Sequence, residues 1–142
     1  MIKMTLIKEM KGKKLIQEFK AKYGNKETLE RAFERDPENV KLHMDLEDWK
    51  YYIDNQNEIV KQTEIIYADK SKIGILELEL MGFIKNESPK SVSELAKIAN
   101  KDLSTIQKKI KTLNENGLIE LKKGNKNSKI PIINYDKIEI AI

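Results

Sequence analysis

The spacing of apolar residues predicts that the first part of the chain is helical. Within residues 1–23, apolar side chains fall mostly three, four or six positions apart, which indicates an amphipathic helix that bends or breaks near Gly12. Residues 26–35 form a shorter helical pattern. The sequence Asp-Pro-Glu then resembles a helix start, because it offers a capping carboxylate followed by proline at the first helical position. We therefore expect a third helix over residues 36–53.

The pattern changes after this helical region. Residues 58–68 are rich in Ile, Val, Thr and Tyr, and this composition favours a β-strand. Residues 71–84 return to helical spacing, with Ile75, Leu78 and Met81 along one stripe. We expect this helix to pack behind the elements that follow it.

The clearest pattern begins at Ser91. Residues 91–99 predict a short helix that starts with a capping box, in which the Ser91 hydroxyl accepts from the Glu94 amide and the Glu94 carboxylate accepts from the Ser91 amide. A tight turn follows at residues 100–101. Asp102 is then placed to cap a longer helix over residues 103–116.

A β-hairpin is expected after this longer helix. Gly117 supplies the left-handed conformation that ends many helices. Residues 118–121 alternate as a strand, residues 124–127 have turn composition, and residues 130–133 form the return strand. The order of helix, turn, helix and basic hairpin is typical of proteins that bind DNA.

The run SVSELAKIANKDLSTIQKKIKTLNENGLIELKKG resembles the DNA-binding core of MarR-like winged-helix transcriptional regulators of prokaryotes. The ending IPIINYDKIEIAI is similar to a subgroup of small regulators that finish on a short hydrophobic strand. The resemblance covers about residues 71–142. It implies a winged helix-turn-helix that binds double-stranded DNA, most simply as a dimeric repressor. We therefore expect an α-rich α+β fold, with a helical region over residues 1–57 and a winged helix-turn-helix domain with a small antiparallel β-sheet over residues 58–142.

Composition narrows the class of protein. The chain has 39% hydrophobic and 35% charged residues, as in soluble globular proteins with somewhat more charge than average. No segment approaches the roughly 18 consecutive apolar residues of a membrane-spanning helix, and the N-terminus does not have the pattern of a secretory signal. The chain contains no cysteine, which excludes disulfides and thiolate sites. A cytoplasmic location is the simplest expectation.

Charge is segregated along the sequence. Residues 1–26 carry eight Lys and two Glu, a balance of +6, whereas residues 27–64 carry five basic and eleven acidic groups, a balance of −6. Residues 97–129 carry nine Lys and three acidic groups, again +6. A basic segment that coincides with the helix-turn-helix pattern indicates a nucleic-acid surface. The alternative is that these are only solvated lysine-rich faces.

The helix over residues 103–116 offers candidate DNA contacts on one side. Its apolar stripe, made of Leu103, Ile106, Ile110 and Leu113, should be buried. The start of the second helix in a helix-turn-helix meets base edges in the major groove. The candidates are Thr105, Gln107 and Lys108 for bases, and Ser104, Lys109 and Lys111 for phosphates. Alternatively, these residues are only the solvated side of an amphipathic helix.

Two further groups of candidates flank this helix. The amides at Ser91 and Ser93 open the shorter helix, where they could hold a phosphate, although capping alone also explains both serines. The hairpin carries Lys122, Lys123, Lys126 and Lys129, which suit the backbone or the minor groove of DNA. If six to eight lysines contact phosphates, log affinity should fall against log salt with a slope of roughly −5 to −7 per protomer. The alternative is that these lysines only keep the hairpin soluble.

The chain end alternates apolar and polar residues over residues 138–142, as in a β-strand. An apolar strand left unpaired favours aggregation, so we expect it to join a sheet, either in the same subunit or across a homodimer. The N-terminal helices are an equally good dimer interface.

Catalysis is not expected. His43 is the only histidine, and Asp45, Glu47 and Asp48 are expected to form a solvated acidic face of a helix. No glycine-rich phosphate loop is present. We therefore expect no enzyme activity, no metal and no cofactor.

The acidic region 38–56 suggests an alternative, because its aromatic residues Trp49, Tyr51 and Tyr52 could dock a basic protein partner, as in a DNA-binding antitoxin. A winged helix used only for protein–protein assembly is a further alternative.

Overall fold

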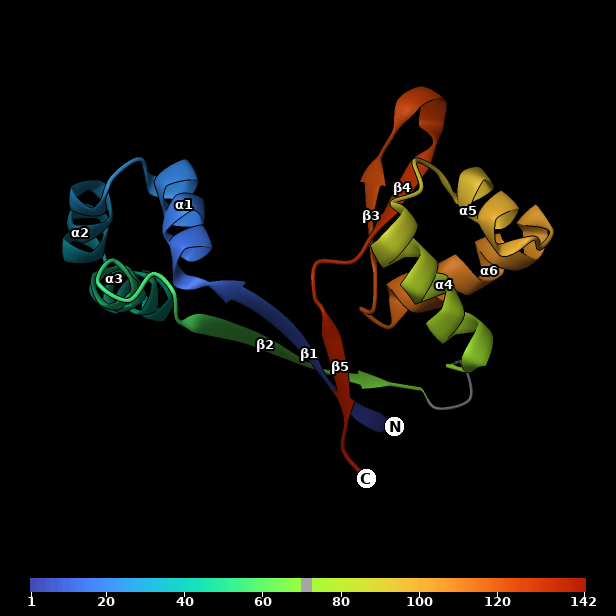
Figure 1. The fold of residues 1–142 in the computed structure, drawn as a ribbon, viewed down its shortest axis with the longest axis horizontal. Coiled ribbons are helices and arrows are strands. Elements are labelled where there is room, and N and C mark those ends of the chain that lie inside the picture. Colours follow the sequence, from blue (N-terminus) through green and yellow to red (C-terminus); the bar gives the residue numbers. More distant parts are fainter. Residues whose placement is uncertain (70–72) are drawn as a thin grey trace. The chain divides into compact units, whose positions relative to one another are not determined.

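The computed structural model describes residues 1–69 and 73–142, which form an α+β fold of helices and small antiparallel sheets (Figure 1). The chain divides into two compact units. The helical unit consists of Lys8–Gln62, and the C-terminal unit combines Met1–Ile7 with Thr63–Ile142. The first residues of the chain thus pack with the C-terminal half, which differs from the expected division after residue 57.

The helical unit contains α1 (Gly12–Tyr23), α2 (Lys26–Arg35) and α3 (Val40–Tyr52). Its core is a cluster of buried apolar side chains in which the rings of Phe19 and Trp49 stack with centroids 5.5 Å apart. The expected helix over residues 26–35 is confirmed. Its Leu29 is fully buried in this core.

The start of α3 differs from the prediction. The Asn39 side chain caps α3 by accepting from the Leu42 amide at 3.1 Å. Asp36 instead ends α2, because its amide donates to the carbonyls of Ala32 and Phe33. The side-chain cap that was expected at Asp36 is therefore formed by Asn39, three residues later.

The N-terminal segment is not helical over its first half. Residues Ile2–Lys11 form strand β1, and α1 begins only at Gly12. The strand buries Met4 and Leu6, which are two positions apart, as expected for side chains on one face of a strand. The same segment also contains apolar residues at helical spacing, which is why the sequence indicated a helix. A side chain at Gly12 would collide with α3 and the turn after it, because an added Cβ would lie 2.8 Å from both Asn55 O and Tyr52 Cδ1.

Strand β1 is the centre of a three-stranded sheet with the order β2-β1-β5. The expected strand over residues 58–68 is confirmed as β2 (Ile59–Ala68). The C-terminal segment is also a strand, β5 (Lys137–Ile140), and it pairs antiparallel with β1 of the same chain, with Leu6 opposite Ile138. Of the two pairings left open for the chain end, the structure thus contains the one within the subunit.

The C-terminal unit also contains α4 (Ile75–Glu87), α5 (Val92–Ala99), α6 (Leu103–Glu115) and the hairpin of β3 (Glu120–Lys123) and β4 (Lys129–Ile132). The hairpin turn includes a short 3-10 segment, Asn125–Asn127. The strands are shifted by one or two residues from their expected positions. Leu80, Leu95, Ile106, Leu113 and Leu118 are fully buried in one core that joins the three helices to β1 and β2.

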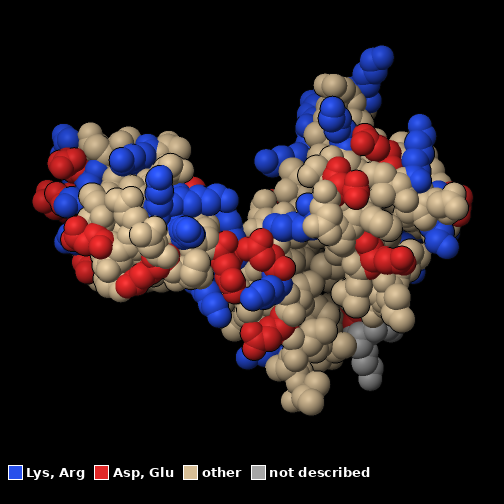
Figure 2. Space-filling model, viewed as in Figure 1, with Lys and Arg blue, Asp and Glu red and all other residues tan. Residues whose placement is uncertain are grey.

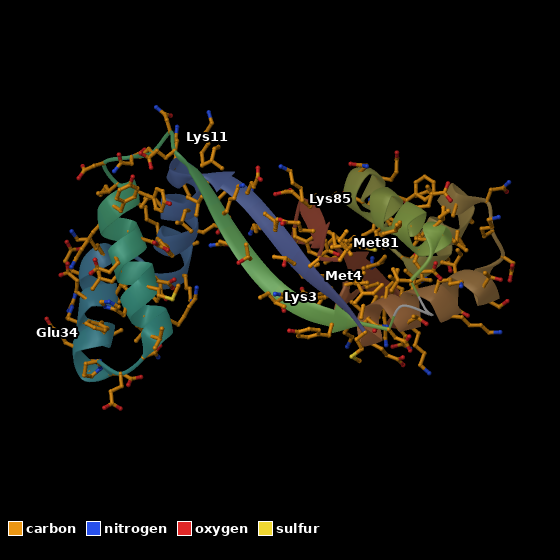
Figure 3. The ribbon with its side chains drawn as sticks, turned by 90° about the horizontal axis from the view of Figure 1, so that it is seen from below. Lys3, Met4, Lys11, Glu34, Met81 and Lys85 are labelled. Atoms are coloured by element: carbon orange, nitrogen blue, oxygen red, sulfur yellow. The ribbon has the colours of Figure 1, made fainter. Side chains whose placement is uncertain are left out.

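Helix α4 buries only one residue, Met81, of the stripe expected from the sequence. Ile75 and Leu78 are 82% and 47% exposed, whereas Leu80, Met81 and Ile84 are buried. Figure 3 shows Met81 beside Met4 of β1, and both belong to the core of the C-terminal unit. The first residues of the expected helix, 71 and 72, lie outside the described part of the chain. Among the residues that are described, no helix is long and apolar enough to cross a membrane.

Candidate nucleic-acid interface

Two adjoining caps position α5 and α6. The Ser91 hydroxyl accepts from the Glu94 amide at 3.0 Å, as expected. The reciprocal bond of the capping box is different, because the Glu94 carboxylate accepts from the amide of Lys90 at 3.3 Å and not from that of Ser91. Asn100 adopts a left-handed conformation with a φ of 53° and ends α5. Each helix is therefore capped locally, and only a short turn separates the two.

The Asp102 carboxylate gathers the polar groups at the start of α6. It accepts from the hydroxyl of Ser104 at 2.6 Å, and from the amide and the hydroxyl of Thr105 at 3.1 and 2.8 Å. The hydrogen bond from Ser104, followed by those from Thr105, lowers the pKa of Asp102 to about 2. The hydroxyl protons of Ser104 and Thr105 thus both take part in hydrogen bonds to the capping carboxylate. Ser104, which was expected to contact a phosphate, has no free hydroxyl proton to offer one in this arrangement, and the hydroxyl proton of Thr105, an expected base contact, is engaged in the same way.

The middle of α6 presents polar side chains that are free. Gln107 and Lys108 are exposed, and among the described residues neither side chain makes a hydrogen bond or an ion pair. Lys111 is exposed as well, and its ammonium lies 3.9 Å from Glu115 Oε1, one turn further along the same helix. A surface pair of this length contributes little, so Lys111 can exchange it for a phosphate at small cost.

Lys109 lies on a different side of α6. Its ammonium is 2.7 Å from Oε1 of Glu77 on α4, and the Glu77 side chain is only 5% exposed. The other carboxylate oxygen of Glu77 accepts from the Gly74 amide at 2.9 Å, at the start of α4. Lys109 was expected to bind phosphate. The structure instead places it in an ion pair between α4 and α6, which the sequence pattern did not indicate.

A groove of about 470 Å³ collects many of the remaining candidates. The start of α5, one side of α6 and the hairpin form its walls. The expected DNA contacts that line it are Ser91, Ser93, Gln107, Lys111 and Lys129. Asn114 and Asn127 also line the groove and were not among the expected contacts, although Asn114 follows Gln107 and Lys111 at helical spacing.

The hairpin carries the remaining lysines. Lys122, Lys123 and Lys129 line a second hollow beside the groove, and Lys126 lies in the exposed turn with a φ of 51°. Figure 2 shows lysine side chains gathered around the tip of this hairpin. An added Cβ at Gly124 would lie 2.6 Å from Ser128 Oγ, so the Ser128 side chain would have to move to admit one. All four hairpin lysines are exposed, and none of them is ion-paired with a described residue.

Of the carboxylates expected to form a solvated face of α3, Glu47 is exposed but Asp45 is buried. Asp45 is 3% exposed and accepts a hydrogen bond from the Tyr23 hydroxyl at 2.6 Å. The ammonium of Lys41 lies 2.9 Å from the same carboxylate. Burial, followed by the hydrogen bond to Asp45, raises the pKa of Tyr23 to about 12. Asp45 is therefore part of the internal packing of this unit.

The aromatic residues of region 38–56 do not form one exposed surface. Trp49 is 2% exposed and belongs to the core, and the exposed Tyr51 donates a hydrogen bond to Glu58 at 2.6 Å. Trp49, the largest of the aromatic residues that were expected to contact a basic protein partner, is therefore not at the surface. His43 is exposed, with its ring 5.2 Å from that of Phe33. Within residues 1–69 and 73–142, no group of three or more His, Asp or Glu side chains is placed to share a metal ion.

A comparison with models of protein families gives a match to the C-terminal half of the chain. The model of a family described as HVO_A0114 matches residues 76–140, from the beginning of α4 to the end of β5. No curated protein and no solved structure matches the chain significantly. The matched segment contains α5, α6 and the hairpin, and thus every residue of the candidate interface.

Proposed function

We propose that α4, α5, α6 and the β3–β4 hairpin form a winged helix-turn-helix that binds double-stranded DNA sequence-specifically, and that the protein is a transcriptional regulator. The observation that carries the proposal is the groove beside α6. It brings the start of α5, the polar side of α6 and a lysine-rich hairpin to one surface. The resemblance of this segment to MarR-like regulators supports the same function.

We expect α6, the start of α5 and the hairpin each to contact a different part of the DNA. Helix α6 enters the major groove, where the Gln107 amide pairs with adenine and the Lys108 ammonium donates to guanine. The amides at the start of α5 face a phosphate, because the positive end of the helix dipole favours an anion. The hairpin lysines lie along the backbone or in the minor groove. Bound to a promoter, the protein would act most simply as a repressor by blocking access to it.

Binding is tested by fluorescence anisotropy on DNA from upstream of the protein's own gene and on scrambled DNA, across a salt series. Tight and salt-dependent binding to the first, with much weaker binding to the second, supports a specific regulator. Equal binding to both indicates a nonspecific architectural protein. If neither DNA binds at low salt, the proposal is wrong and a winged helix used only for protein–protein assembly is favoured.

Removing the two free side chains in the middle of α6 should weaken specific binding. We expect Gln107→Ala together with Lys108→Ala to cost about 1–3 kcal/mol on the preferred site and to reduce the difference from scrambled DNA. The measurement is anisotropy on both DNAs. Gln17→Ala with Lys14→Ala is the matched control, since it removes the same two residue types from exposed positions of α1. An equal loss in this control would contradict a role for α6 in reading bases.

A further inference from the structure

Strand β5 lies at one edge of the sheet, and the backbone groups on its open side make no hydrogen bond with a described residue. Ala141 lies opposite Lys3 in the β1–β5 register, and its amide donates to the Lys3 carbonyl. Hydrogen-bonded and non-hydrogen-bonded pairs alternate in an antiparallel ladder. The next hydrogen-bonded pair is therefore Thr5 with Glu139. It follows that the N–H and C=O groups of Ile138 and Ile140 point away from β1.

This open edge is apolar on one face. Ile138 is half-buried, and Ile140 is 49% exposed. Both lie on the face that β1 buries, because Leu6 is opposite Ile138 and Met4 is opposite Ile140. No described strand lies beyond β5 in this sheet. An edge with free amides and apolar side chains is a template for pairing with another strand.

We propose that two copies of the chain associate through antiparallel pairing of β5 with β5 around a twofold axis at Ile138. The sheet then continues as β2-β1-β5-β5-β1-β2. Ile138 exchanges both of its backbone hydrogen bonds with Ile138 of the second copy, and the two side chains meet on the inner face. This geometry uses the amides that face away from β1.

The charges of β5 favour this register over its two neighbours, which are centred on residues 137 and 139. Centred on Ile138, Lys137 lies opposite Glu139 of the second copy, and Glu139 lies opposite Lys137, so that each dimer contains two opposite-charge pairs. Moving the axis to residue 137 places lysine opposite lysine, and moving it to residue 139 places glutamate opposite glutamate. Intermediate registers pair side chains from opposite faces of the sheet and are excluded. The other edge strand, β2, has no such pairing, because Lys61 and Glu64 point to opposite faces.

The test is a charge exchange measured by sedimentation or light scattering over a concentration series, without DNA. The wild-type protein should reach twice the mass of one chain. Lys137→Glu alone and Glu139→Lys alone each place like charges opposite one another at two positions, so we expect the dissociation constant of the dimer to rise about tenfold in each. The protein with both changes restores two opposite-charge pairs and should dimerise like the wild type.

A matched control makes the outcome decisive. Lys14→Glu introduces the same change of charge at an exposed position of α1 and should leave dimerisation unchanged. A wild-type protein that stays monomeric overturns the proposal. A dimer that ignores the single changes, or one that the double change fails to restore, overturns it as well. Because no DNA is present, these results are independent of whether the protein binds DNA.

Discussion

Replacing Lys109 with alanine is expected to lower the free energy of unfolding of the C-terminal unit by about 2–3 kcal/mol. Removing one partner of a buried ion pair commonly costs about 3–5 kcal/mol, because the remaining charge loses its compensation. The side chain of Glu77 is 5% exposed, but that of Lys109 is 38% exposed, so water partly replaces the ammonium. We therefore place the expected loss below the usual range.

The matched control is Lys108→Ala, one residue earlier on the same helix. It removes the same side chain from an exposed position without an ion pair and should change stability by less than about 0.5 kcal/mol. Its expected effect is on DNA binding instead. Equal losses of stability in the two variants would show that the Lys109–Glu77 pair contributes nothing specific.

The choice of measurement matters because the only tryptophan, Trp49, lies in the helical unit. Tryptophan fluorescence therefore reports the unit that should not change. Urea unfolding followed by circular dichroism reports the helices of both units, and amide hydrogen exchange of α4 and α6 reports the C-terminal unit alone. The fluorescence transition of the Lys109→Ala protein shows whether the helical unit is affected as well.

The same pair predicts a dependence on pH. Burial by itself would raise the pKa of Glu77, but the hydrogen bonds from Lys109 and from backbone amides hold it below its ordinary value of 4.5. A carboxyl whose pKa is lowered by folding stabilises the protein above its ordinary pKa, and this contribution is lost as the pH falls through the folded value. Without Lys109, only the hydrogen bonds from backbone amides oppose the effect of burial, so the pKa of Glu77 rises relative to that in the wild-type protein. The deficit of the Lys109→Ala protein should thus be largest near neutrality and should shrink as the pH falls through about 4.5.

The order of helices α5 and α6 could be predicted because their boundaries depend on local chemistry. Ser91 and Asp102 each accept from an amide three residues ahead, and Gly117 has the positive φ that the end of α6 requires. These signals involve near neighbours in the sequence. The orientation of individual side chains depends on elements further away in the sequence. The polar residues of α6 therefore could not be separated into those that face solvent and Lys109, which pairs with Glu77 of α4.

Strand β1 shows where local reasoning fails. Apolar residues at positions 2, 6 and 10 fit one face of a helix, and those at positions 2, 4 and 6 fit one face of a strand. The choice depends on β2 and β5, which lie about 60 and 130 residues further along and supply the hydrogen bonds of the sheet. Helix α4 has a similar ambiguity, because leucine and glutamate alternate near its start. Its buried glutamate becomes understandable only when Lys109 is seen beside it.

The hairpin lysines should have the largest effect on DNA binding. We expect the joint replacement of Lys122, Lys123, Lys126 and Lys129 by alanine to reduce the slope of log affinity against log salt by about 3 to 4 units, because each phosphate contact contributes roughly 0.9. At physiological salt this corresponds to a roughly thousandfold loss of affinity. The loss should be similar for the preferred site and for scrambled DNA, because contacts with phosphates position the protein without reading the sequence.

A control with the same net charge separates the hairpin from a general electrostatic effect. Lys11, Lys13, Lys14 and Lys20 are exposed residues at the end of β1 and on α1 of the helical unit. Replacing these four by alanine lowers the net charge by the same amount but removes no hairpin contact. Anisotropy across a salt series should show a much smaller change of slope in this protein. If both proteins lose slope and affinity equally, the total charge of the chain governs binding, and the hairpin does not hold the DNA backbone.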